Sequence, residues 1–155
     1  MTLKSLLFVP GDSEKKMAKA ASTGADALLL DLEDAVAQDR LPLARGLVLE
    51  YLKHHDRAQQ QVWVRINPLN TSLSLPDLVA VMPGQPDGIV LPKPLNAQAV
   101  QQLDHFLSAL EQREGIATGH TRILPVATEV AGALFELNSY AGCSSRLVGL
   151  TWGAE

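Results

Sequence analysis

The chain has 155 residues, of which 46% are hydrophobic, so it is long enough for a single domain, residues 1–155, with a sizeable core. The net charge of −4 and the lack of any Lys/Arg-rich run argue against a nucleic-acid surface. The single cysteine, Cys143, cannot form an internal disulfide, and neither a membrane span nor a signal-peptide pattern is found. We therefore expect a cytoplasmic protein that binds neither membranes nor nucleic acid.

Short apolar runs alternate with amphipathic stretches, which predicts strands alternating with helices. In chain order we expect a strand at 3–10, a helix at 13–22, a strand at 27–32, a helix at 41–55, a strand at 62–66, a short helix at 75–81 and a strand at 88–91. A helix capped by Asn96 and ending at Gly115, a strand at 122–127, a helix at 132–140 and a strand at 146–150 follow. The helix after Asn96 has the clearest pattern, because apolar residues recur every three or four positions up to Leu110.

Regular alternation of strands and helices predicts an α/β fold with a parallel sheet. Two architectures fit. An open, doubly wound sheet of six strands would be complete at this length, whereas an eight-stranded barrel takes about 250 residues and would be incomplete here. Length and composition favour the open sheet, but its Gly-rich phosphate loop is poorly matched by the segment at 10–13, which has one glycine and an aspartate.

Charged or amide side chains follow five of the predicted strands. In barrels, the catalytic groups lie on the loops just beyond the carboxyl ends of the strands. The sequence therefore predicts that several carboxylates and an arginine gather on one rim. These residues are Asp31, Glu33, Asp34, Arg65, Asn67, Lys93, Glu129 and Glu155.

Six motifs, taken together and in order, resemble the citrate lyase beta subunit and malyl-CoA lyase family, the HpcH/HpaI-type aldolases. They are KSLLFVPGD, LLLDLEDAV, VWVRINPL, DGIVLPK, the TEV segment and LTWGAE, and they extend over the whole chain. The resemblance implies an eight-stranded (β/α)8 TIM-type barrel, of which this chain would supply about six strands. It also implies a Mg²⁺-dependent carbon–carbon lyase that cleaves citryl-, malyl- or citramalyl-type thioesters of CoA or of an acyl-carrier protein, and a homo-oligomer.

The resemblance also implies roles for individual residues. Glu129 matches the first Mg²⁺ ligand of the family, and the second, an aspartate, would follow Glu155. Arg65 matches an arginine that grips substrate oxygens, and its planar fork suits a carboxylate. Lys4 stands where the family more often has arginine. The implied catalytic residues are Arg65, Glu33 and Asp34, and the implied substrate-binding residues are Arg65, Lys4 and Asn67.

Each assignment has a simpler structural alternative. The acidic residues at 31–34 could form a solvated loop, Arg65 could pair with a nearby carboxylate, and Glu129 could be an exposed residue at a helix N-terminus. Lys93 could form an imine with a keto substrate. The family that the chain resembles uses a metal ion instead, so we expect Lys93 only to pair with the acidic rim. The four histidines lack metal-ligand spacing and are expected at the surface.

Two functions from different classes follow. The first is the N-terminal portion of an active Mg²⁺-dependent lyase. The second is a truncated, catalytically inactive half-barrel that acts as a binding or interaction module.

Overall fold

The computed structural model describes residues 3–153. Five strands form one parallel sheet in the order β1-β2-β3-β4-β5: β1 (Leu6–Pro10), β2 (Ala27–Asp31), β3 (Gln61–Arg65), β4 (Gly88–Leu91) and β5 (Arg122–Pro125). The α-helices are α1 (Glu14–Ala21), α2 (Leu41–His54), α3 (Ser74–Val81) and α4 (Ala97–Glu114). Short 3-10 helices span Gln38–Arg40, Met82–Gly84 and Ala131–Tyr140.

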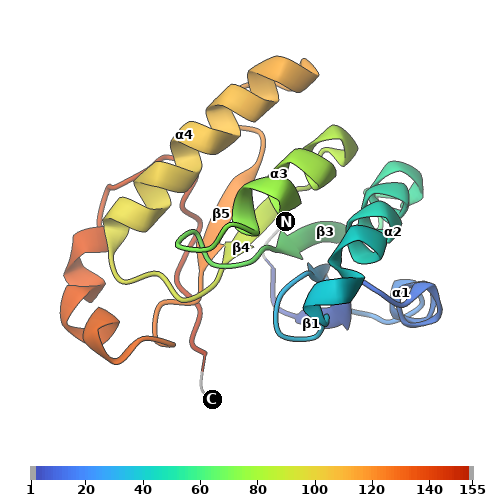
Figure 1. Ribbon diagram of the computed structural model, residues 1–155, viewed down its shortest axis with the longest axis horizontal. Helices are drawn as coiled ribbons and strands as arrows, with labels where there is room; N and C mark the ends of the chain where they lie inside the picture. Colours follow the sequence, from blue (N-terminus) through green and yellow to red (C-terminus); the bar gives the residue numbers. More distant parts are fainter. Residues whose placement is uncertain (1–2, 154–155) are drawn as a thin grey trace.

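The strand order decides between the two architectures. In a doubly wound sheet the order reverses at one point and helices cover both faces. Here the order follows the chain without reversal, and α1 to α4 lie on one side of the sheet (Figure 1). The sheet is therefore a partial barrel, as the family resemblance implied, and the open sheet favoured by length and composition is wrong.

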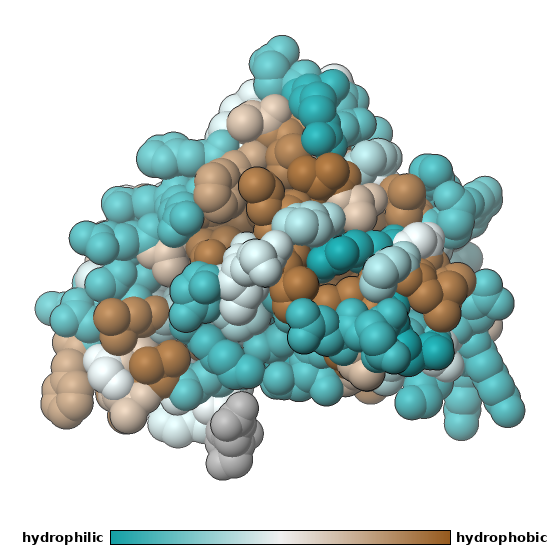
Figure 2. Space-filling model, in the orientation of Figure 1, coloured by the Kyte–Doolittle hydropathy of each residue, from teal (hydrophilic) through white to brown (hydrophobic). Residues whose placement is uncertain are grey.

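Side-chain alternation along the strands builds two apolar layers. Residues such as Leu30 and Val64 point toward the helices and pack in the main core with Leu103 of α4. The opposite face carries a smaller cluster, Ala27, Leu29, Trp63, Val90 and Val126. On the side shown in Figure 2, hydrophobic residues gather near the middle and hydrophilic residues surround them.

The glycine at the start of β4 makes room for the largest side chain of the smaller cluster. A Cβ on Gly88 would lie 2.2 Å from a ring carbon of Trp63. Because Trp63 is only 2% exposed, its ring has little space to move away.

Within residues 3–153, no helix combines the length and the apolar character needed to cross a membrane.

The predicted sixth strand at 146–150 is wrong. The segment meets β5 only through isolated bridges, Ile123 with Leu147 and Val126 with Thr151. The Val148 N–H donates to the Ile123 carbonyl, and the next N–H that donates to β5 is that of Thr151, to the Pro125 carbonyl. These two donors are three residues apart, whereas donors in a regular strand are two residues apart. Pro125 has no N–H to donate, so the ladder is interrupted where a regular strand would continue.

The start of the first strand and the type of the last helix also differ from the prediction. The first strand begins at Leu6 instead of residue 3, because the N–H groups of Lys4 and Ser5 donate to the carboxylate of Asp26 and not to a neighbouring strand. The helix predicted at 132–140 is a 3-10 helix, Ala131–Tyr140. This segment includes Gly132, Asn138 and Ser139, which are poor α-helix formers.

Candidate active site

A buried ion pair forms the base of the candidate site. Asp31 and Arg65 are register partners at the carboxyl ends of β2 and β3. The Arg65 Nε and Nη2 atoms each donate to an Asp31 carboxylate oxygen at 2.7 Å, and the Asp31 side chain is only 1% exposed. Asp31 also accepts the backbone N–H groups of Glu33 and Ala35, so it shapes the loop that carries the acidic pair.

The third nitrogen of the Arg65 guanidinium faces the acidic pair. Its Nη1 lies 3.1 Å from Glu33 Oε2 and 3.6 Å from Asp34 Oδ2. The guanidinium carbon sits 4.7 Å from the centre of the Phe8 ring, a cation–π contact. Burial acts to lower the pKa of Arg65, but the hydrogen bonds that Arg65 donates to Asp31 and the charges of the surrounding carboxylates outweigh this effect and raise the pKa. Arg65 is therefore a permanent cation, and Asp31 takes two of its donors, Nε and Nη2.

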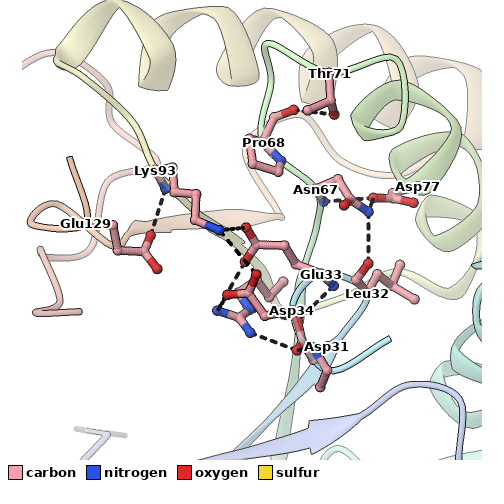
Figure 3. A network of polar contacts seen from close by, with 12 residues as sticks. Asp31, Leu32, Glu33, Asp34, Asn67, Pro68, Thr71, Asp77, Lys93 and Glu129 are labelled. Carbon is pink, nitrogen blue, oxygen red and sulfur yellow. Dashed lines mark hydrogen bonds and ion pairs between the residues drawn. The ribbon is translucent and has the colours of Figure 1, made fainter. Parts of the chain in front are cut away.

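Lys93 joins three parts of the rim (Figure 3). Its Nζ lies 2.8 Å from Glu33 Oε1 and 3.2 Å from Asp34 Oδ1, and its backbone N–H donates to Glu129 Oε2 at 2.8 Å. The hydrogen bond with Glu33 is the largest influence that raises the pKa of Lys93, so the amine stays protonated. The expected pairing with the acidic rim is confirmed, and a protonated amine is unsuited to imine formation.

The backbone of Lys93 has an unusual conformation. Its φ of +50° lies in the left-handed region, which residues with a Cβ rarely adopt. This conformation occurs between Pro92 and Pro94, in the turn that points the N–H at Glu129. Backbone strain of this kind costs about 1–3 kcal/mol and is concentrated at functional sites.

Glu33 is the carboxylate with the most perturbed environment in this cluster. It is 6% exposed, and its Oε2 atom has no hydrogen-bond partner among the described residues, since the contact with Arg65 Nη1 lacks hydrogen-bond geometry. Burial raises the pKa of Glu33 even though Lys93 and Arg65 act against it. A raised pKa favours the protonated form of a carboxyl group and is a feature of groups that exchange protons in active sites.

Glu129 is the side chain that best fits a metal ligand. It is half-buried, and the Lys93 N–H fixes one of its two oxygens. Mg²⁺ takes oxygen ligands, and enzymes often hold it through one or two carboxylates with water and substrate completing the shell. Within residues 3–153, no group of three or more His, Cys, Asp or Glu side chains is arranged to hold a metal ion. Glu129 thus fits one ligand position, and the nearby acidic pair binds Lys93 and Arg65 instead.

Residues 4–155 match the family model described as HpcH/HpaI aldolase/citrate lyase. The chain belongs to this family. The citrate lyase subunit beta of Haemophilus influenzae is 35% identical over 152 residues, which cover 98% of this chain and 52% of that protein. The chain spans about half the length of the curated citrate lyase beta subunits it matches.

Solved structures of the family superpose on the chain. The citrate lyase beta subunit of Mycobacterium tuberculosis, complexed with oxaloacetate and magnesium, is 31% identical with a TM-score of 0.71, over 96% of this chain and 57% of that chain. The protein CitE of the same organism, in complex with magnesium, acetoacetate and coenzyme A, is 30% identical with a TM-score of 0.73, over 99% and 49% of the two chains.

Two residues that the resemblance to the HpcH/HpaI family implied are not brought to the rim as substrate contacts. Lys4 precedes β1, at the amino end of the sheet, and a five-residue strand separates it from the rim by about 17 Å. Asn67 is buried, and its amide group donates to the Leu32 carbonyl in the loop after β2 and to Asp77 of α3, so both donors have structural partners. Glu155 lies outside the described residues.

Sequence reasoning missed a buried charge network at α4. Arg146 is 2% exposed and bonds Glu111 through two nitrogens at 2.7 Å each, and Asp104 at 2.6 Å. Asp104, Ser108 and Glu111 recur at helical spacing, so one polar stripe faces Arg146 from the helix. The polar stripe was the signal in the sequence that could have indicated a buried network. Its partner, Arg146, lies in the segment that was predicted as a strand.

Proposed function

We propose that the protein cleaves a carbon–carbon bond in a β-hydroxyacyl thioester of the citryl, malyl or citramalyl type. The products would be an acetyl thioester and an α-keto acid. The observation that carries this proposal is the linked cluster of Arg65, Glu33, Asp34, Lys93 and Glu129 at the carboxyl edge of the sheet. Membership of the HpcH/HpaI aldolase/citrate lyase family supports it.

The cluster contains the groups that this reaction requires. The β-hydroxyl loses its proton, the bond to the α-carbon breaks, and its electron pair passes to the thioester enolate, which then takes up a proton. Glu33 is our candidate for proton exchange, because burial raises its pKa. Arg65 and Lys93 place two positive charges beside the acidic pair, and the Arg65 Nη1 atom is the part of the fork that Asp31 leaves for a substrate carboxylate.

Glu129 would hold Mg²⁺ in this proposal, with its carboxylate positioned by the Lys93 N–H. When bound, Mg²⁺ supplies a Lewis acid for the hydroxyl and carbonyl oxygens of the substrate. The chain itself orients the carboxylate, keeps the cation Lys93 at a fixed place beside it, and holds Asp31 and Arg65 below the rim.

The activity is tested with citryl-CoA, malyl-CoA and citramalyl-CoA, each with Mg²⁺ or with EDTA. Trapping of the α-keto acid as its phenylhydrazone gives one absorbance assay for all three substrates. We expect Mg²⁺-dependent formation of keto acid from at least one of them. Failure with all three, or equal rates in EDTA, contradicts the proposal.

The metal role is tested by Glu129→Gln, which keeps the shape of the side chain but removes its charge. The matched control is Glu136→Gln, on the exposed 3-10 helix. We expect calorimetry to show weaker Mg²⁺ binding, at least about tenfold, only in Glu129→Gln, because a carboxylate ligand is lost. Equal Mg²⁺ affinity in the two variants would remove Glu129 from the site.

The second candidate function is a catalytically inactive binding module. One observation favours it: Glu33 and Asp34 are already engaged by the cations Arg65 and Lys93. This function predicts that the acyl thioester binds without turnover and that binding is unchanged by Mg²⁺. The keto-acid assay and a thioester titration in EDTA therefore separate the two functions.

A further inference from the structure

An aromatic ring faces the guanidinium of Arg65. Phe8 is the third residue of β1 and is the register partner of Leu29 in β2. Leu29 and Trp63 belong to the smaller cluster on the side of the sheet opposite the helices. Side chains of paired residues, like those of residues two apart on one strand, point to the same side of a sheet. Phe8 and Arg65 therefore share that side, and the guanidinium carbon lies 4.7 Å from the centre of the Phe8 ring.

Core packing does not account for the position of this ring. Phe8 is 49% exposed, and neither hydrophobic cluster of residues 3–153 includes it. The next residue, Val9, is buried in the main core on the other side of the strand. Among the described strands, β1 is the first in the sheet order and pairs only with β2 (Figure 1). The ring thus lies at the margin of the sheet, where it contacts the cation Arg65.

The surroundings of the guanidinium leave one nitrogen for a ligand. Asp31 accepts from Nε and Nη2, which fixes the guanidinium plane, and the Phe8 ring lies against the guanidinium carbon. The remaining nitrogen, Nη1, is 3.1 Å from Glu33 Oε2, without hydrogen-bond geometry, and 3.6 Å from Asp34 Oδ2. A carboxylate ligand of Arg65 therefore meets Nη1, and its binding depends on how firmly the guanidinium is held.

We propose that Phe8 is a positioning residue that holds Arg65 in the place where its Nη1 atom meets the substrate carboxylate. This inference rests on the proposed function. The face of an aromatic ring attracts a cation, and the planar guanidinium stacks on aromatic rings. Asp31 and Phe8 thus fix the guanidinium from two directions, by hydrogen bonds and by the cation–π contact.

Three substitutions on β1 test the role of the ring. Phe8→Leu keeps an apolar side chain but removes the aromatic face, whereas Phe8→Tyr keeps that face. Leu6→Ala is the control, because Leu6 lies on the same side of β1, two residues further from the rim, and is also exposed. Circular dichroism shows whether each variant is folded. If Phe8→Leu is unfolded, Phe8→Met replaces it, and unfolding of both overturns the proposal, because the ring would then be needed for the fold.

The first measurement is steady-state cleavage of the thioester that is active in the Mg²⁺-dependent assay. We expect Phe8→Leu to raise KM at least about fivefold and to leave kcat within about twofold, because a less firmly held Arg65 binds the substrate and the transition state less tightly by the same factor. Phe8→Tyr should restore the wild-type KM, and Leu6→Ala should leave it unchanged.

The second measurement does not depend on turnover. Pyruvate, an α-keto acid with one carboxylate, is titrated into each protein in EDTA, so that the carboxylate is not held by Mg²⁺, and its binding is followed by ligand-observed NMR. We expect the Kd for pyruvate to rise at least about fivefold in Phe8→Leu. The Kd should stay within twofold of wild type in Phe8→Tyr and in Leu6→Ala.

Several results overturn the proposal. They are an unchanged Kd for pyruvate in Phe8→Leu, and no saturable binding of pyruvate to the wild-type protein. An increase in Phe8→Tyr as large as in Phe8→Leu also overturns it, because Phe8→Tyr keeps the aromatic face. An equal increase in Leu6→Ala does so as well, because the effect would then not be local. In an active enzyme, a fall in kcat at an unchanged KM would show that the ring acts on the chemical step and not on carboxylate binding.

The two measurements separate this inference from the proposed function. The expected pattern of pyruvate binding in a protein that cleaves none of the three thioesters would refute the proposed function and leave the assignment of Phe8 standing. Mg²⁺-dependent cleavage with wild-type KM and wild-type pyruvate affinity in Phe8→Leu would support the proposed function and refute the assignment of Phe8.

Discussion

Replacing Arg65 with lysine tests how strongly the rim depends on its buried ion pair. Arg65→Lys keeps the charge but replaces two parallel N–H donors with one ammonium. Asp31 accepts both donors at 2.7 Å and is 1% exposed, so at least one charge-assisted hydrogen bond is lost without replacement by water. Such bonds contribute about 1.5–3 kcal/mol each, and we expect the free energy of unfolding to fall by about 2–3 kcal/mol.

Urea denaturation measures this change, with Arg40→Lys as the control. The Arg40 side chain is 48% exposed and pairs with Asp12 at the surface, so its substitution should cost less than about 1 kcal/mol. A free energy of unfolding for Arg65→Lys within the error of the control would refute our reasoning about the buried pair.

The same Arg65→Lys variant also tests the catalytic proposal. If Arg65 holds a substrate carboxylate, turnover should fall at least about tenfold, equivalent to roughly 1.4 kcal/mol of transition-state stabilisation. Assays without urea, at a temperature well below the melting transition, keep the variant folded. Wild-type turnover combined with reduced stability would mean that Arg65 has only a structural role.

Three further predictions concern the fold. Arg146→Met should lower the free energy of unfolding by about 3–5 kcal/mol, because Glu111 then keeps a buried charge without its partner, and Arg146→Met with Glu111→Leu should recover most of this in urea denaturation. Burial acts to raise the pKa of Glu111, but the hydrogen bonds from Arg146 and two backbone N–H groups outweigh this effect and lower the pKa. The stabilisation that ionised Glu111 contributes is therefore present above its unfolded pKa of about 4.3 and is lost as the pH falls through its folded pKa. The difference in unfolding free energy between wild type and Arg146→Met should accordingly become smaller from pH 7 to pH 3. Gly88→Ala should cost about 1–3 kcal/mol by the same assay, since its Cβ meets the Trp63 ring, and an unchanged midpoint would show that the ring moves freely.

Local sequence determined the elements whose signals lie within a few residues. The helix after Asn96 forms as predicted: the Asn96 side chain accepts the Gln98 N–H, and Gly115 ends the helix with a φ of +68°. These signals need no tertiary partner, because a cap and a left-handed glycine act on the adjacent turn. The gathering of Asp31, Arg65 and Lys93 also followed from the sequence, since parallel strands end at one edge.

The tertiary structure decided which predicted side chains share the site and which stabilise loops. Asn67 lies two residues after Arg65, the last residue of β3, yet its amide group donates to Leu32 and Asp77 and not toward the rim. The backbone N–H of Lys93 donates to Glu129, a residue 36 positions later, because Lys93 adopts a left-handed backbone conformation. No local sequence pattern predicts this conformation.

The strand predicted at 146–150 was lost for a similar reason. Its apolar residues satisfied the local pattern, but the missing N–H of Pro125 interrupted the pairing. The polar stripe of α4, which includes Asp104 and Glu111, pairs with Arg146 instead. Local patterns in a sequence specify the turns and faces of individual elements, whereas a buried charge is satisfied only by partners that the folded chain brings together from distant positions.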